Sequence, residues 1–476
     1  MVQKRDKIVF NGIVAEKGTP LAPPIDYELF QKRLVEGLET PKAKPLADAL
    51  SAYLASIQRA HFLFPTPNLN NPGQVGWALL LYPGNEENRK IARALAPLVE
   101  LRKGKVVFCD APPDTNWINN NYTYRPEKER PYYILLAGSP QQLPFDFQYS
   151  LDVNAAVGRL ALDRVEDYAA YAEKVVSFEK DGSRQVDKRA LFFATEHGEE
   201  DATAQSKRYI ADPLAKMLKG KHIPVNYIEG KSATFERLSE SLVQESSETS
   251  PALVFTVSHG NAVDGGAKNE EKRWQEQGAL VCQDSRIFAA HDVPDGKFLH
   301  GSIFIGYACF SAGSSSRSDF LHWMPDDADF KPIKEGLACC LPQEDYVAAL
   351  PKRLLAHPEG PLAFIGHIEV LIVESFADAN LNAGASASRL GPLKQLIDDL
   401  TGGATVGYAV RGVNEAYSRA NAEIATLEDK LQYHRSRGEK VPEGASISLV
   451  NNFILRNDSQ NYIILGDPAV RAKYAR

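Results

Sequence analysis

Short apolar runs bounded by turn residues recur along the first half of the chain and predict buried β-strands. Between the first two runs, Glu86–Leu101 carries apolar residues at helical spacing. Strands that alternate with helices favour βαβ units and a mainly parallel sheet. The predicted strands are Trp77–Tyr82, Lys105–Cys109, Tyr132–Ala137 and Ala155–Leu162.

The second half repeats this alternation more strongly. Its apolar runs are continuous rather than alternating, which suits strands buried on both faces of a sheet. A long amphipathic helix is predicted late in the chain, between Val413 and Leu431. The predicted strands are Ala190–Ala194, Val225–Ile228, Ala252–Val257, Ala279–Cys282, Ile303–Ala308 and Leu362–Ile365, and the predicted helices are Ser206–Leu218, Phe235–Gln244 and Tyr346–Leu355.

Changes in composition divide the chain into three parts. Residues 1–70 are rich in proline and polar residues, with one helical stretch around Tyr27 to Ile57, and are interpreted as an extension that covers or packs against the rest of the chain. The segment EKDGSRQ at 179–185 is typical of a linker. We therefore predict an α/β fold with two sheet units joined near residue 180, the first in residues 71–185 and the second in residues 186–476.

Composition and charge narrow the classes of partner. The chain has 476 residues, of which 44% are hydrophobic, and a net charge of −7, which favours neither nucleic acid nor an anionic membrane. Five cysteines without CxxC spacing fit a reducing compartment and argue against a zinc ribbon or a disulfide framework. The apolar run Ile8–Phe10 is too short for a signal peptide, and no run approaches the roughly 18–20 apolar residues that span a bilayer. A cytoplasmic protein is expected.

Two of the predicted strands end in chemically reactive residues. The run ALVFTV is followed by Ser258-His259-Gly260, and the run SIFIGYA is followed by Cys309. Groups just beyond the carboxyl ends of parallel strands converge at one edge of the sheet. His259 and Cys309 could therefore face each other if these strands are neighbours.

Such a pair suits nucleophilic catalysis. A nearby imidazolium lowers the pKa of a thiol and can return a proton to a leaving amine. Gly260 would let the backbone approach a peptide substrate, and its N–H could form an oxyanion hole with that of Cys309. The competing interpretation is structural, because a cysteine at the end of an apolar strand usually belongs to the core.

These segments resemble gingipain-type peptidases, within the wider group of caspases, legumain, clostripain, separase and CHAT-domain proteases. The group carries an apolar strand followed by His-Gly and a later apolar strand followed by Ala-Cys, which VFTVSHG and IFIGYAC match. Further segments resemble the gingipain branch over roughly residues 75–475: YYILLAGSPQQLPF (132–145), NAAVGRLALDRVEDYAAYAEKVV (154–176), PLAFIGHIEV (361–370) and the closing IILGDPAVR (463–471).

The resemblance implies a smaller Rossmann-like α/β subdomain, then a caspase-like mostly parallel sheet flanked by helices. It also implies an acyl-enzyme formed on Cys309, without a metal in the chemistry. In gingipains a carboxylate often orients the catalytic histidine, and Glu196, directly after the strand ALFFAT, is the candidate. The alternative is that Glu196 belongs to a solvated acidic loop, EHGEED. In that loop His197-Gly198 mimics the His-Gly motif, but no second cysteine follows at a suitable spacing.

Residues for substrate binding are less well defined. Arginine-specific relatives carry a pocket acid in the loop after the first catalytic strand, where this chain has Asp201 and Arg208. Lysine-specific relatives use an acid well after the nucleophile, a region that here contains Asp326, Asp327 and Asp329. An acidic pocket would favour a basic side chain. Arg208 and Arg317 could equally bind an acidic one.

Several functions therefore remain open. The first is a cytosolic cysteine endopeptidase that acts on proteins or peptides and is gated by a partner, a ligand or processing, as in bacterial defence or regulatory effectors. The second is a non-catalytic scaffold or peptide-binding module, and the third an acyltransferase or ligase. No cofactor is required, although structural calcium is possible because gingipain relatives bind it. His367 is interpreted as a core histidine or a residue lining the cleft, and Cys282, Cys339 and Cys340 as structural.

Overall fold

The computed structural model describes residues 7–37, 67–181, 185–243, 249–296, 298–324, 326–376, 389–440 and 442–474. The part of the predicted helical stretch that follows residue 37 lies outside these ranges. Within them no helix is both long enough and apolar enough to cross a membrane.

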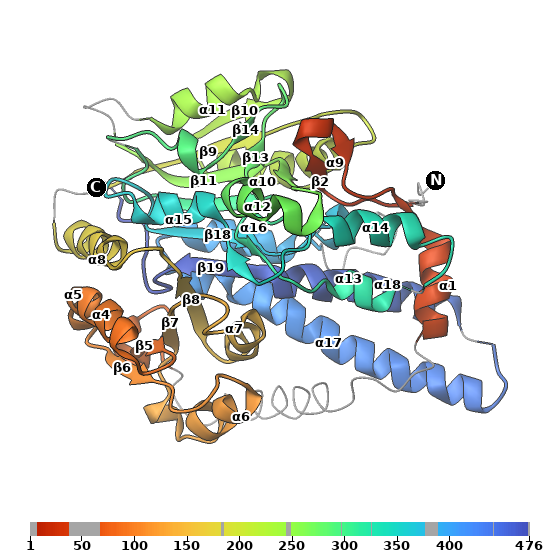
Figure 1. Ribbon diagram of the computed structural model, residues 1–476, viewed down its shortest axis with the longest axis horizontal. Helices are drawn as coiled ribbons and strands as arrows, with labels where there is room; N and C mark the ends of the chain where they lie inside the picture. The colour runs from red at the N-terminus through yellow and green to blue at the C-terminus, as the bar shows by residue number, and fades with distance from the viewer. Residues whose placement is uncertain are drawn as a thin grey trace.

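A ten-stranded sheet forms the centre of the molecule (Figure 1). Its order is β10-β9-β11-β15-β18-β19-β8-β7-β5-β6, and eight of its neighbouring pairs are parallel, while β18 and β19 are antiparallel. The sheet has helices on its faces, so the predicted α/β class is confirmed and the arrangement is consistent with a caspase-like fold. The strands are β5 (Trp77–Leu81), β6 (Lys105–Phe108), β7 (Tyr133–Ala137), β8 (Ala156–Leu160), β9 (Asp187–Ala194), β10 (Val225–Glu229), β11 (Pro251–Val257), β15 (Ile303–Tyr307), β18 (Ala363–His367) and β19 (Tyr462–Gly466).

The last strand, β19, joins the two halves of the chain into one sheet. It pairs antiparallel with β18 and parallel with β8, so the expectation of two separate sheet units is corrected. The direction of the strands reverses at this point. The carboxyl ends of β9, β11, β15 and β18 therefore meet at one edge of the sheet, and those of the first-half strands point toward the opposite edge.

The residue after β19 also ties the halves together. Asp467 is fully buried, and its carboxylate accepts hydrogen bonds from the Trp77 indole at 2.9 Å and from Arg102 Nε at 2.7 Å. Arg102 in turn forms a bidentate pair with Glu179. A buried charge is stable only when it is paired in this way, so the closing Gly-Asp-Pro segment anchors the first half of the chain.

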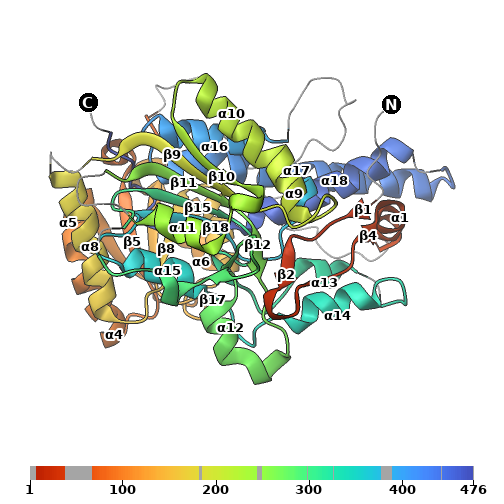
Figure 2. The ribbon, with the colours of Figure 1, turned by 90° about the horizontal axis from the view of Figure 1, so that it is seen from above.

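Helices cover both faces of the sheet (Figure 2). On one face, α10 packs over β10, and α16 packs over β11. Helix α17 lies against α16 and also contacts β8 and β19. On the other face, α15 packs against β18 and contacts α8. Helix α8 in turn packs against α4 and α5. The bounds are α4 (Glu86–Ala94), α5 (Ala96–Arg102), α8 (Val165–Lys180), α10 (Asp212–Gly220), α15 (Ala349–Ala356), α16 (Gly391–Thr401), α17 (Val406–Ser436) and α18 (Glu443–Asn461).

Shorter elements fill the connections. The predicted strand Ala279–Cys282 lies outside the large sheet, as part of a hairpin formed by β13 and β14. The predicted helix Tyr346–Leu355 starts later, because Tyr346 and Val347 pair with the loop after β15. These elements are α3 (Pro72–Val75), α6 (Thr115–Ile118), α7 (Phe145–Asp152), α9 (Ala202–Ser206), α11 (Phe235–Leu242), β12 (His259–Asn261), α12 (Glu270–Glu276), β13 (Leu280–Val281), β14 (Ile287–Phe288), β16 (Gly313–Ser314), α13 (Asp319–Trp323), α14 (Lys331–Cys339) and β17 (Tyr346–Val347).

The N-terminal segment, residues 7–37, is built into the fold rather than appended to it. Its strand β2 (Gly12–Val14) lies between β3 (Thr19–Pro20) and β12 in a five-stranded sheet of order β14-β13-β12-β2-β3. Strands β1 (Lys7–Ile8) and β4 (Ile25–Asp26) pair with each other, and α1 (Tyr27–Gly37) follows. Helix α1 packs on α18, where the rings of Phe30 and Phe453 lie 6.0 Å apart.

Candidate active site

The two strands that end in His259 and Cys309 are direct neighbours. Strands β11 and β15 are parallel, and Val257 pairs with Tyr307. All seven residues of β11 and all five of β15 are buried, as the continuous apolar runs predicted. His259 and Cys309 each lie two positions beyond this last pair, so both emerge at the same edge of the sheet.

Gly260 packs directly against the backbone of Cys309. A Cβ built on Gly260 would lie 1.8 Å from the carbonyl oxygen of Cys309 and 2.9 Å from its amide nitrogen. Any side chain at this position would collide with the backbone of Cys309. Glycine is therefore required for β12 to pass next to the cysteine.

Cys309 sits on a strained turn. The following residue, Phe310, has a φ of 58°, a left-handed conformation that is unusual for a bulky side chain. The turn is held by the Phe310 N–H, which donates to the Glu369 carbonyl at 3.2 Å. Local strain of this kind persists only where the surrounding structure enforces it, and it clusters at functional sites.

The Cys309 thiol is fully buried in this conformation. Its Sγ accepts a hydrogen bond from the Leu371 N–H at 3.0 Å and contacts the carbonyl oxygen of Asn11. Burial raises the pKa of the Cys309 thiol well above its usual value. The cysteine is therefore a neutral thiol while it is covered, and exposure of the site would remove the main cause of that shift.

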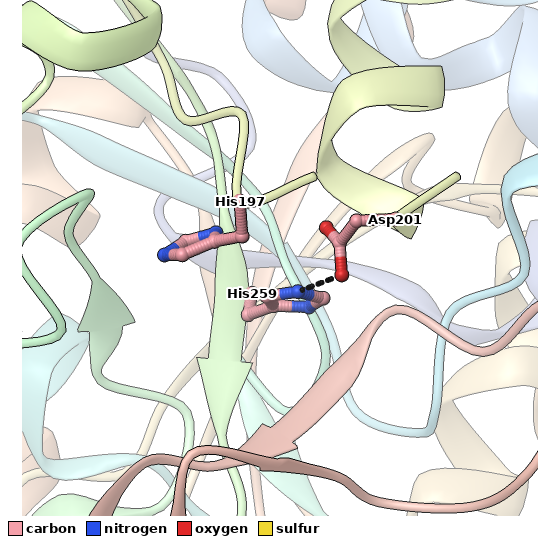
Figure 3. A group of neighbouring side chains, drawn as sticks. All are labelled: His197, Asp201 and His259. Carbon is pink, nitrogen blue, oxygen red and sulfur yellow. Dashed lines mark hydrogen bonds and ion pairs between the residues drawn. The ribbon is translucent and has the colours of Figure 1, made fainter. Parts of the chain in front are cut away.

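Asp201 is the carboxylate that meets His259 (Figure 3). It is the N-cap of α9, where its Oδ1 accepts a hydrogen bond from the Thr203 N–H at 2.8 Å. Its Oδ2 lies 3.0 Å from Nε2 of His259. Burial opposes the charge on Asp201, but the hydrogen bonds from His259 and Thr203 outweigh it and lower the Asp201 pKa to about 2. The other ring nitrogen of His259, Nδ1, is buried and makes no hydrogen bond within the described part of the chain.

Glu196 does not occupy the position beside His259 that the sequence suggested for it. Its side chain is exposed, and its backbone N–H donates to the Gln283 side chain at 2.6 Å. Four more residues of the loop follow Glu196 before Asp201, the N-cap of α9. The cap geometry of that helix, rather than closeness to the strand end, brings a carboxylate to the histidine.

His197 lies on the other side of His259. Their ring centroids are 5.2 Å apart, with planes inclined by 35° (Figure 3). Nδ1 of His197 lies 3.3 Å from the Thr203 hydroxyl and Nε2 lies 3.1 Å from the Cys282 carbonyl. Burial, and secondarily the neighbouring His259, lower the His197 pKa, so His197 is a neutral ring at physiological pH.

His197, Asp201 and His259 also have the composition of a metal site. One ligand atom from each lies within 4.8 Å of the others, and three such ligands suffice for catalytic zinc. However, both ring nitrogens of His197 and the Oδ2 of Asp201 already have protein partners. The group is therefore better suited to orienting His259 than to binding an ion.

The residues suggested for substrate binding are scattered. Asp201 lies in the site, but at the histidine. Arg208 and Arg317 are exposed, and Arg208 stacks on its neighbour Tyr209. The acids after the nucleophile form ion pairs within the chain: Asp326 with Lys334, and Asp327 and Asp329 with Arg33 of α1, at 3.0 and 3.9 Å. Asp327 and Asp329 therefore contact the N-terminal helix.

The buried residues around the site include two ionisable groups near the nucleophile. His367 is fully buried, with Nδ1 2.8 Å from the Glu369 carbonyl, and burial lowers its pKa to about 4, as expected for a satisfied core histidine. Burial also raises the pKa of the Glu369 carboxyl to about 8. Glu369 is therefore largely protonated at neutral pH and adds little charge near Cys309.

Sequence reasoning expected the N-terminal segment to cover or pack against the rest of the chain, but it did not predict which residues of the segment reach Cys309. Asn11 and Gly12 lie directly over Cys309: the Asn11 carbonyl contacts Sγ, and a Cβ on Gly12 would lie 3.6 Å from it. The only local signal is the pair Asn-Gly after the apolar run Ile8–Phe10, which ordinarily indicates a turn.

Comparisons with known proteins add little to this geometry. No family model and no curated protein matches the chain. Among the solved structures that the chain resembles is one named "Structure of Protease"; the match covers 85% of this chain and 80% of that one, with 13% sequence identity and a TM-score of 0.46. Similarity at this level carries no argument about function.

Proposed function

We propose that the protein is a cysteine endopeptidase in which Cys309 is the nucleophile and His259 its general base. The observation that carries this proposal is the Asp201 carboxylate on Nε2 of His259, at the sheet edge where the neighbouring strand β15 leads to Cys309. Chemistry of this kind needs a nucleophile, a base and a group that orients the base.

Each group has a defined task in the proposed reaction. Asp201 holds Nε2 of His259 as an N–H donor, which leaves Nδ1 to exchange a proton. His259 takes the proton of the Cys309 thiol, and the thiolate attacks the carbonyl carbon of a peptide bond. His259 then gives the proton to the leaving amine, and water hydrolyses the thioester.

The backbone around Gly260 and Cys309 supplies the polar part of the site. Because Gly260 has no Cβ, its amide and that of Cys309 can approach the same carbonyl oxygen. Removal of one such donor costs about 2.7–4 kcal/mol of transition-state stabilisation in a well-studied serine peptidase. Glycine at position 260 is thus both a packing requirement and a catalytic one.

The decisive experiment is cleavage of a mixed peptide library under reducing conditions. We expect activity from the wild type and none from Cys309→Ala or His259→Ala. Cys282→Ala is the matched control, because it removes a buried thiol that also ends an apolar run but lies outside the dyad. Equal cleavage by wild type and Cys309→Ala would refute the proposal.

A peptide-binding module is the second candidate, and the complete burial of Sγ favours it. A strand that pairs with an extended segment can bind a peptide without catalysing any reaction. The rate of iodoacetamide labelling at Cys309 separates the two candidates. In a peptidase whose cover opens, Cys309 is labelled while the protein is still folded, whereas in a scaffold Cys309 is labelled only when the protein unfolds.

A peptidase in the cytoplasm requires restraint, and we propose gating by the N-terminal segment together with an activating partner or ligand, in a bacterial defence or regulatory pathway. The chemistry proposed here requires no cofactor, and calcium at a loop would be structural. A peptide substrate is the partner implied by the site.

A further inference from the structure

A cavity lies between the first half of the chain and the segment 467–473, which follows β19. Its volume is about 410 Å³, within the range of sites that bind small molecules. It is lined by residues 101–103 at the end of α5, by residues 178–179 of α8, and by four residues of the segment 467–473. Helices α5 and α8 lie side by side at this end of the molecule (Figure 1).

This cavity is at the edge of the sheet opposite the candidate active site. The carbonyl of Lys473, which lines the cavity, accepts a hydrogen bond at 2.8 Å from the Val186 N–H, directly before β9. A Cβ on Gly301, two residues before β15, would lie 2.2 Å from the ring of Phe178 in the cavity wall. Strand β15 therefore begins beside the cavity and leads to Cys309 at its other end, so the two sites are separated by the length of the strand.

The lining is cationic, although the net charge of the chain is −7. Four of its eleven residues are basic, and only Glu179 is acidic. Arg102 is already neutralised, because it pairs with Glu179 and with the buried Asp467 behind the wall. With both of these acids counted, an excess of two positive charges remains. The cations left over are Lys103, Arg471 and Lys473.

The partners of these cations are neutral. Arg471 donates from Nη2 to the Asn70 carbonyl at 2.7 Å, and Lys473 donates to the Asp181 carbonyl at 2.7 Å. Lys103 is exposed, and none of the three forms an ion pair within the ranges that the structure describes. Burial lowers the pKa of the Arg471 guanidinium, as expected for a charge that its surroundings do not fully compensate.

The remaining lining is apolar. It consists of Pro72, Gly73, Leu101, Phe178, Ala469 and Ala472. An inorganic ion would pair with the cations but leave this surface in contact with water. A molecule that fills the cavity must therefore combine a negatively charged group with an apolar body.

We propose that this cavity is a binding site for a small organic anion. The carboxylate or phosphate group of the ligand is held by Lys103, Arg471 and Lys473, and its apolar body packs on Leu101 and Phe178. The inference goes beyond the proposed function and does not depend on it, because no residue of the cavity takes part in the proposed chemistry. The ligand contacts both the first half of the chain and the segment 467–473, so its binding also stabilises the folded protein.

The test is isothermal titration calorimetry of the full-length protein at low salt. The probes are phenyl phosphate and benzoate, with benzyl alcohol as their uncharged counterpart and inorganic phosphate as an anion without an apolar body. We expect at least one of the two organic anions to bind, and benzyl alcohol and inorganic phosphate to bind at least about tenfold more weakly. If neither organic anion binds at millimolar concentration, or if inorganic phosphate binds more tightly than phenyl phosphate, the proposal is overturned.

Matched variants locate the bound anion. Lys103→Ala and Lys473→Ala should each weaken its binding about fivefold, because each removes one charged partner. Arg471 is kept, since it also holds the backbone at Asn70. Lys268→Ala, which removes an exposed lysine after β12, and Cys309→Ala should both bind like the wild type. Equal affinity of the wild type, Lys103→Ala and Lys473→Ala would place the anion elsewhere and overturn the proposal.

Discussion

Replacement of Gly12 by valine should uncover Cys309. A Cβ at Gly12 would lie 3.1 Å from Leu21 Cδ2, 3.3 Å from Leu21 Cβ and 3.6 Å from Cys309 Sγ, and valine adds two further carbons. The first two distances are already tight, so strand β2 must shift away from the cysteine. Extra methyl groups in a packed site typically destabilise it by about 1–3 kcal/mol.

The effect can be read from the chemical labelling of Cys309. A fully buried thiol reacts with iodoacetamide only when its cover opens, so the labelling rate follows the opening equilibrium. Destabilising the closed form by about 1–3 kcal/mol should raise that rate by about 5- to 150-fold. Peptide mapping by mass spectrometry measures each cysteine separately.

Two controls separate local opening from general loss of stability. Gly220→Val places the same side chain where nothing lies within 4 Å of the new Cβ, and should leave Cys309 labelling unchanged. Cys109, which is buried in a separate core cluster of the first half of the chain, should label at one rate in all variants. If Gly12→Val labels Cys309 no faster than the wild type, the N-terminal segment does not control access to the thiol.

Three further predictions concern the histidine and the N-terminal helix. Asp201→Asn should lower kcat/KM by more than about tenfold, because an asparagine side chain no longer holds Nε2 of His259 as an N–H donor, whereas Glu196→Gln should leave kcat/KM unchanged; a similar loss in both would contradict the assignment. The Asp201 pKa is lowered to about 2. Because that pKa is depressed, the stability it contributes is present above about pH 4 and lost as the pH falls through about 2. The difference in unfolding free energy between wild type and Asp201→Asn, from urea titrations at pH 3 to 6, should therefore narrow below pH 4, and a constant difference would count against the pair. Phe30→Ala removes a buried ring that packs on Phe453 and should weaken docking of α1 by about 3 kcal/mol. It should speed labelling of Cys309 without changing that of Cys109, and an unchanged Cys309 rate would show that α1 does not hold the cover.

The sequence by itself determined the strands and the two residues at their ends. Strands buried on both faces must be apolar throughout, so β11 and β15 were visible as continuous runs, and the residues after them had to lie at a sheet edge. His259, Gly260 and Cys309 could therefore be selected before any pairing was known, because their placement depends on local chain direction. The same reasoning found the α/β class but divided the sheet in two, since nothing local shows that β19 pairs with both β18 and β8.

Only the tertiary structure decided which groups complete the site. Asp201, rather than Glu196, meets His259 because its carboxylate is fixed by capping α9. Which of the two acids in this loop reaches the histidine depends on that cap and on the position of β11. The cover over Cys309 depends on pairing between Gly12 and Gly260, residues far apart in the chain. Pairing over such separations depends on the space left by all the other elements, so a short segment such as Phe10–Val14 carries no signal of its partner until the fold is complete.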